Sequence, residues 1–166
     1  SHQLLISSSA SGIDLPELEV DIKVTSVNQP QSSCPFKSAR QKIFGLGYSL
    51  LIFVYSKTDE PESKTATLNI LHAIFIHKNR TADYQTTTGL QKILANNPNA
   101  DDLVAFMRDR FFLFYDIEAY AIAEELLNNK TLTEGYLTIP NALQWRLQYS
   151  RAITVAGEVD GIVRIR

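Results

Sequence analysis

The segment Asp14-Leu-Pro-Glu-Leu-Glu-Val-Asp-Ile-Lys23 organises the rest of the chain. From Glu17 to Val24 charged and apolar residues alternate strictly, so the charged side chains share one face and the apolar side chains share the other. This period of two predicts a half-buried β-strand. Asp14 precedes Pro16, which cannot donate to a β-ladder, so we expect Asp14 on a turn or a separate short segment that leads into the strand.

Acidic side chains and a lysine converge in this prediction. Side chains on one strand face lie about 6.5–7 Å apart, so Asp21 and Lys23 project into the same space, with Glu19 beside them and Asp14 close by. Two carboxylates suit a hard divalent cation such as Mg²⁺, which activates water and neutralises phosphoryl charge, while the ammonium orients the attacking water. The chemistry indicated is phosphodiester hydrolysis. An Asp-x-Lys motif alone has an alternative interpretation, in which its charged side chains only form a solvated face of the sheet.

The whole pattern is an Asp followed seven residues later by the acid of an acid-x-Lys strand, with Leu-Pro-Glu-Leu-x-Val between. It resembles the metal-binding signature of the P-D-(D/E)-x-K nuclease superfamily, and within it the type II restriction endonucleases and the MutH-like enzymes. The resemblance implies that Asp14 and Asp21 are metal ligands, that the carbonyl of Ile22 can be a further ligand, and that Lys23 is the catalytic lysine. It also implies Mg²⁺ as cofactor and double-stranded DNA as substrate.

Three features depart from that family. The second acid is Asp21 where the MutH-like pattern more often has Glu, and no acidic residue precedes Asp14, although the family uses an acid on an upstream helix. We therefore expect at least one helix upstream. The formal charge of −2 lacks the basic excess of many nucleic-acid-binding proteins. An alternative stays open: a non-catalytic DNA-binding or protein-interaction module on the same fold.

Length and composition predict one compact unit, because 166 residues with 45% hydrophobic content can bury a substantial core. We divide it into a nuclease core over residues 1–82 and a helical region over 83–166 that could recognise DNA. The single Cys34 excludes an internal disulfide and fits a reducing cytoplasm. No apolar run approaches the length of a membrane span, so we expect no membrane partner. Cleavage of both strands of a palindrome favours a twofold homodimer.

The expected fold class is α/β: a restriction-endonuclease-like mixed β-sheet flanked by helices, with a mainly helical C-terminal half. A loop follows the first strand over residues 28–33. Hydrophobic periodicity, proline and glycine then predict a helix over 35–46 with Ser32 or Ser33 as N-cap, followed by strands over 48–55 and 65–77 joined by a hairpin across 57–64. A further helix is capped by Thr86, Thr87 or Thr88. The remaining elements are helices over 101–110, 116–128 and 140–151 and a closing strand over 162–166.

The helix over 35–46 carries the first set of predicted DNA contacts. In related nucleases the helix after the lysine-bearing strand often lines the phosphate path, so Lys37, Arg40 and Gln41 are interpreted as contacts to the DNA backbone or as residues that position water. The alternative is an ordinary solvated helix face.

The helix over 140–151 carries the second set. Gln144, Gln148 and Arg151 step by four and three residues along one side. Glutamine and arginine suit bidentate readout of adenine and guanine edges, so these residues are interpreted as DNA-binding. The alternative is an amphipathic helix packed on the core.

Overall fold

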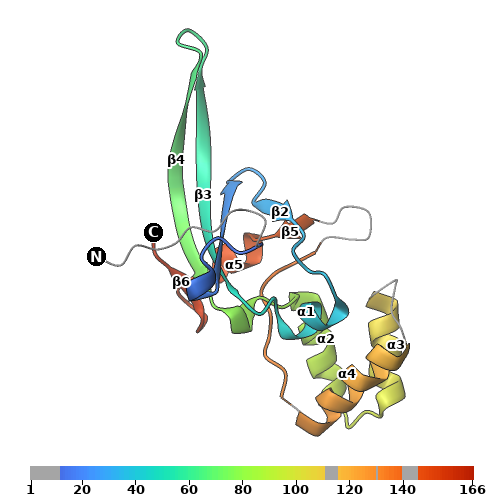
Figure 1. Ribbon diagram of the computed structural model, residues 1–166. Coiled ribbons are helices and arrows are strands. Elements are labelled where there is room, and N and C mark those ends of the chain that lie inside the picture. The colour runs from blue at the N-terminus through green and yellow to red at the C-terminus, as the bar shows by residue number, and fades with distance from the viewer. Residues whose placement is uncertain (1–11, 111–115, 130, 140–145) are drawn as a thin grey trace.

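The computed structural model describes residues 12–110, 116–129, 131–139 and 146–166. A four-stranded sheet runs through one part of the molecule (Figure 1), and its first strand is parallel to the second while the other pairs are antiparallel. The predicted mixed α/β arrangement is therefore confirmed. In sheet order the strands are β1 (Val20–Ser26), β3 (Ser49–Glu60), β4 (Thr65–Ile76) and β6 (Ile162–Arg164).

Helices α1 to α4, between residues 39 and 129, occupy the other end of the molecule in Figure 1, α5 (Ser150–Val155) lies beside the sheet, and a two-stranded ribbon lies between the two parts. No helix among the described residues has the length and apolar character needed to cross a bilayer. The helices are α1 (Ala39–Phe44), α2 (Tyr84–Leu94), α3 (Ala100–Arg110), α4 (Asp116–Asn129) and α5 (Ser150–Val155); the ribbon pairs β2 (Gln31–Ser33) with β5 (Arg146–Gln148), and short 3-10 helices span Pro16–Leu18 and Lys78–Arg80.

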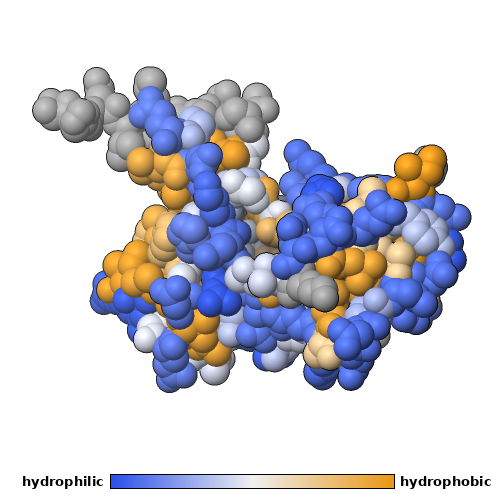
Figure 2. All heavy atoms as spheres, turned by 90° about the horizontal axis from the view of Figure 1, so that it is seen from below, coloured by the Kyte–Doolittle hydropathy of each residue, from blue (hydrophilic) through white to orange (hydrophobic). Residues whose placement is uncertain are grey.

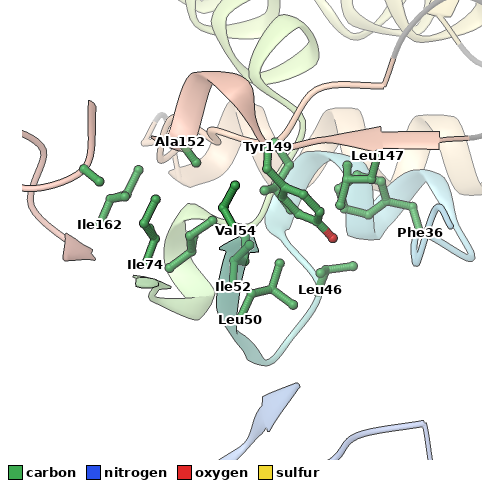
Figure 3. Close-up of a cluster of buried hydrophobic side chains, with 13 residues drawn as sticks. Phe36, Leu46, Leu50, Ile52, Val54, Ile74, Leu147, Tyr149, Ala152 and Ile162 are labelled. Carbon is green, nitrogen blue, oxygen red and sulfur yellow. The ribbon is translucent and has the colours of Figure 1, made fainter. Parts of the chain in front are cut away.

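Two clusters of buried apolar side chains hold the described chain together. The sheet cluster joins one face of β3 and β4 to α5 and to β5, and Figure 3 shows Tyr149 and Ala152 above Val54 and Ile52, with Leu147 beside Phe36. The helical cluster joins α1, α2, α3 and α4. Residues from the C-terminal half thus contribute to both clusters, and the division at residue 82 stays a prediction.

The strand expected from Glu17 to Val24 is wrong at its start and in its buried face. The chain forms a 3-10 turn over Pro16–Leu18, and β1 begins only at Val20. Asp21 is 4% exposed whereas Val24 is 60% exposed, so the face with the acid is turned toward the sheet cluster. Figure 2 shows exposed apolar side chains on the part of the molecule that contains the sheet. The inversion arises because the β2–β5 ribbon and α5 cover the Asp21 face.

The first predicted helix is shorter than expected, because its proposed caps take another role. Ser32 and Ser33 lie in β2, inside the segment that was expected to be a loop. The helix α1 starts at Ala39, and the hydroxyl of Ser38 accepts a hydrogen bond of 3.2 Å from the N–H of Gln41. Ser38 is therefore the N-cap, in agreement with the preference of helix starts for serine.

The helix predicted over 140–151 is wrong for the residues that the structure describes. Arg146–Gln148 is a strand that pairs with β2, and helical structure begins at Ser150. Nonlocal pairing with β2 overrides the helical spacing of these residues. Asp83, rather than a threonine, caps α2. The helices over 101–110 and 116–128 and the closing strand are confirmed within two residues.

The hairpin between β3 and β4 is longer than the loop predicted across 57–64. The two strands stay paired as far as Glu60 opposite Thr65, well beyond the end of β1 at Ser26 opposite Tyr55. Figure 1 shows this ribbon projecting from the body of the molecule as an arm. We call residues 55–70 the β-arm.

Candidate active site

A tight turn brings Asp14 next to the first strand. The N–H of Leu15 donates to the carbonyl of Val20 at 2.9 Å, and the N–H of Val20 donates back to Leu15 at 3.1 Å. Between them Glu19 takes a left-handed conformation with φ of 53°. The chain therefore reverses direction just before β1, as expected from Pro16, and Asp14 returns to the side of the residues that follow Val20.

The backbone of β1 fixes the Asp14 carboxylate. Its Oδ2 accepts a hydrogen bond of 2.9 Å from the N–H of Ile22. On the other edge of the strand, the carbonyl of Glu19 accepts from the N–H of Ser49 in β3 at 2.8 Å. The N–H and C=O of one strand residue point to the same edge, so the Ile22 carbonyl is directed toward the edge where Asp14 lies. Side-chain and backbone oxygens thus meet beside β1.

Asp21 and Lys23 form an ion pair on the inward face of β1. The Nζ of Lys23 lies 2.7 Å from Oδ2 of Asp21, with side-chain exposures of 29% and 5%. An unpaired carboxylate at this depth would be costly, so the ammonium compensates the buried charge. Asp14 therefore lies against the backbone of the residue between Asp21 and Lys23, and the roles predicted for these three residues stay predictions.

Two tyrosines lie near the Asp21 carboxylate. Burial raises the pKa of Tyr149 to about 12, and the negative charge of Asp21 adds to this effect. Burial also raises the pKa of Tyr48, again with a contribution from Asp21. Both side chains consequently stay protonated at neutral pH. The Tyr149 hydroxyl lies 2.6 Å from the hydroxyl of Ser32 and so joins β2 to the sheet cluster.

Thr25 is a positioning residue that our sequence analysis missed. Its side chain is buried on the same face as Asp21 and Lys23, two positions further along β1. The hydroxyl accepts from the N–H of Gln31 at 2.9 Å and donates to the Gln31 carbonyl at 3.0 Å. Thr25 therefore fastens the β2–β5 ribbon to the strand with the acid and the lysine. The period of two beyond Lys23 was a signal that could have revealed it.

The predicted DNA contacts of α1 lie in a network of structural contacts. Lys37 is exposed, and its backbone N–H donates to the Gln41 side chain at 2.6 Å, so Gln41 helps to cap the helix. Arg40 pairs with Glu125 at 2.5 Å and lies 5.0 Å from the centre of the Phe44 ring. Their contact with DNA stays a prediction.

The second predicted set is not arranged as a row on one helix. Gln148 lies in β5 opposite Gln31, and the Arg151 guanidinium lies over the ring of Tyr84 at 3.6 Å. Gln144 lies outside the described residues. The predicted row of side chains along one helix is therefore wrong. Contact of these side chains with DNA stays a prediction.

The oxygen atoms beside β1 fit a magnesium ion. Among the described residues no three histidine, cysteine, aspartate or glutamate side chains gather in a group that could hold a metal. Mg²⁺ needs no such group, because it is commonly held by one or two carboxylates and keeps several waters. The Asp14 carboxylate at the edge of β1, the Ile22 carbonyl on the same edge and the Asp21 carboxylate on the inward face are oxygen groups of the kind that Mg²⁺ binds.

Comparison with known proteins places this arrangement in a family. Residues 1–164 match the family model described as type II restriction enzyme NspV. The chain belongs to this family. The type II restriction enzyme NspV of Nostoc sp. (strain ATCC 29411 / PCC 7524) is 60% identical over 164 residues, which are 99% of this chain and 74% of that protein. No solved structure matches the chain.

Membership in the NspV family agrees with the resemblance to restriction endonucleases inferred from the sequence. The matched region contains the turn at Asp14, β1 and the β2–β5 ribbon, so Asp14, Asp21 and Lys23 lie inside the region shared with NspV.

Proposed function

We propose that the protein is a Mg²⁺-dependent type II restriction endonuclease that hydrolyses phosphodiester bonds in double-stranded DNA. The observation that supports this proposal is the hydrogen bond that holds the Asp14 carboxylate against Ile22, the residue between the paired Asp21 and Lys23. Membership in the NspV family supports the reaction class. The mixed sheet also agrees with a restriction-endonuclease-like core.

In this proposal Asp14 and Asp21 hold the metal, and the Ile22 carbonyl is a further ligand. When bound, Mg²⁺ supplies a water of lowered pKa and neutralises charge on the scissile phosphate. The N–H of Ile22 orients the Asp14 carboxylate, and the turn over Pro16–Leu18 keeps it beside β1. The backbone therefore holds the two acids in place before any ligand arrives.

Lys23 is the proposed catalytic lysine. Asp21 holds its ammonium on the inward face of β1 while leaving it partly open to solvent. An ammonium in this position can donate a hydrogen bond to the attacking water and stabilise the negative charge that develops on the phosphate oxygens. Its long stem lets the ammonium turn from Asp21 toward a bound phosphate.

The remaining parts of the proposal concern the partners. Cleavage of both strands of a symmetric site favours two active sites related by a twofold axis, so we propose a homodimer that acts on DNA in the cytoplasm. Lys37, Arg40 and Gln41 remain candidate backbone contacts, and Gln148 and Arg151 remain candidate contacts on the β5 side. Family membership, together with the Asp21–Lys23 ion pair, supports an active nuclease over the alternative of a non-catalytic module.

Digestion of plasmid and phage DNA tests this function. We expect discrete fragments with Mg²⁺, none with EDTA, and none with the Asp21→Asn variant, which keeps the shape of the side chain but removes its charge. Asp109→Asn in α3 is the matched control, because Asp109 is exposed and lies outside the proposed site, so cleavage should be unchanged. Cleavage by a folded Asp21→Asn protein at the rate of the unsubstituted protein would disprove the site assignment.

A further inference from the structure

The β-arm has two chemically different faces. Leu50, Ile52 and Val54 point into the sheet cluster, so the alternation of β3 places Ser56 and Thr58 on that same side. Directly opposed residues of antiparallel strands share a face, and the register sets Asn69 opposite Ser56, Thr67 opposite Thr58 and Thr65 opposite Glu60. We call this side the inner face of the arm.

The inner face presents hydroxyl and amide groups along its length and carries the charged Glu60 at the tip. Between the body and the tip it carries Ser56, Thr58, Thr67 and Asn69. On the outer face Tyr55 lies opposite Ile70, Lys57 opposite Leu68 and Asp59 opposite Ala66. The Nζ of Lys57 forms an ion pair with Oδ1 of Asp59 at 2.7 Å. Hydroxyls and amides can both donate and accept, as the edges of base pairs require.

The inner face is continuous with the face that carries the active-site residues. Asp21 lies opposite Leu50 and Lys23 opposite Ile52 across the β1–β3 pair, and all four side chains belong to the same side of the sheet. A β-bulge where Val54 is followed by Tyr55 shifts the register of β4 at the base of the arm. Bulges bend and twist the strands that contain them, and this one lies between the part of the sheet that carries Lys23 and the arm.

The dimensions of the arm suit a DNA groove. A two-stranded ribbon fits the major groove of B-DNA, which is about 12 Å wide. From Ile52, level with Lys23, to Glu60 at the tip, β3 extends about 26 Å at the usual rise per residue. That reach corresponds to about seven or eight base pairs along a duplex. In bound DNA the arm can therefore contact bases several base pairs away from the scissile phosphate, which in the proposed function is placed next to Lys23.

The charges of the tip argue against a simple backbone clamp. Residues 57–64 contain Lys57 and Lys64 but also Asp59, Glu60 and Glu62, a formal balance of +2 and −3. Phosphates repel such a tip, so it adds little sequence-independent affinity. The uncharged hydrogen-bond donors and acceptors of the inner face, between the tip and the body, are better suited to contact with base edges.

We propose that the inner face of the β-arm enters a groove of double-stranded DNA and contributes to the choice of cleavage site. This inference rests on the proposed nuclease function. The side chains assigned to the contact are Ser56, Thr58, Thr67 and Asn69.

Two double variants of equal charge separate the two faces. Thr58→Glu with Thr67→Glu places two carboxylates on the inner face, while Ala66→Glu with Leu68→Glu places two on the outer face at the same height. The probe is a plasmid fragment that carries a cleavage site mapped with the unsubstituted protein, and binding is measured by fluorescence anisotropy in EDTA. We expect the inner-face pair to weaken binding about tenfold or more and the outer-face pair to leave it within about twofold. Thermal melting establishes that both variants fold.

The outcomes are distinct from those of the proposed function. Equal binding by both double variants, in a protein whose cleavage depends on Asp21, would overturn the arm inference alone. The arm inference would also be overturned if the outer-face pair weakened DNA binding and changed the oligomeric state in analytical ultracentrifugation. The arm would then contact a second copy of the chain. Should the glutamate pair fail to fold, Thr58→Ala with Thr67→Ala takes its place, and a change of twofold or less in affinity then refutes the inference. A protein that neither cut nor bound DNA would refute both.

Discussion

The Oδ2 atom of Asp14 lies 2.9 Å from the backbone nitrogen of Ile22, eight residues later in the chain. This hydrogen bond joins the turn before β1 to the strand that holds Asp21 and Lys23. It gives Asp14 a structural role that can be separated from its proposed role as a metal ligand, because an amide oxygen can accept the same bond without carrying a charge.

Substitution of Asp14 separates these roles. Asp14→Asn keeps an acceptor for the Ile22 N–H, so we expect a melting temperature close to that of the unsubstituted protein but a loss of cleavage of at least about 100-fold. Asp14→Ala removes the acceptor as well, and its free energy of unfolding should fall by about 1–2 kcal/mol. Denaturation and plasmid cleavage assays check both values. Rapid cleavage by Asp14→Asn would show that the charge is not needed.

Metal binding should stabilise the folded protein. The turn holds Asp14 beside β1 only in the native state, so Mg²⁺ or Ca²⁺ should bind the folded protein and raise its melting temperature. At a metal concentration of a hundred times the dissociation constant, the stabilisation is about 2.7 kcal/mol. The Asp21→Asn variant should lose this response. Differential scanning calorimetry with increasing metal provides the measurement. An equal rise in both proteins would place the ion elsewhere.

Tyr149 should make the protein sensitive to alkaline pH. Its pKa rises from 10.0 to about 12 on folding, chiefly through burial, so the unfolded chain loses this proton more readily than the native protein. The stabilising contribution is complete below pH 10.0 and is lost as the pH rises toward about 12. The loss is on the order of 1.4 kcal/mol per pH unit. Urea unfolding at several pH values should show a shallower decline for Tyr149→Phe.

Ser32→Ala is the control for this pH dependence. It removes the hydroxyl 2.6 Å from Tyr149 but leaves the buried phenol in place. We expect a loss of about 1 kcal/mol at neutral pH and an alkaline decline that persists. Identical alkaline curves for Tyr149→Phe and the unsubstituted protein would contradict the assignment of the decline to Tyr149.

A close backbone approach makes Gly135 sensitive to any side chain. A Cβ atom at this position would lie 2.1 Å from the carbonyl oxygen of Ala82, and the Gly135 N–H donates to the Thr87 hydroxyl at 2.9 Å. Gly135→Ala should therefore lower the free energy of unfolding by about 3 kcal/mol. Gly47→Ala is the comparison, since its Cβ meets nothing within 4 Å and only the φ of 88° is strained. Chemical denaturation should rank Gly47→Ala as the milder change.

The sequence by itself determined the features that depend on neighbours in the chain. The Asp-x₆-Asp-x-Lys spacing, the proline in the turn and the period of two predicted a turn at Asp14 and a strand with Asp21 and Lys23 on one face, and the structure has both. Helices α3 and α4 were predicted almost to the residue, because capping and amphipathic spacing are local properties. The central strand β3 was evident from its apolar run.

Only the tertiary structure decided which faces are buried and which segments pair. Alternation along β1 could not show that Asp21 points inward and Val24 outward, because burial depends on what packs against the strand. Arg146–Gln148 has helical spacing but becomes a strand, since β2 offers hydrogen bonds from more than a hundred residues away in the chain. The shift between Val54 and Tyr55, which sets the faces of the β-arm, is likewise a property of the strand pair rather than of either sequence.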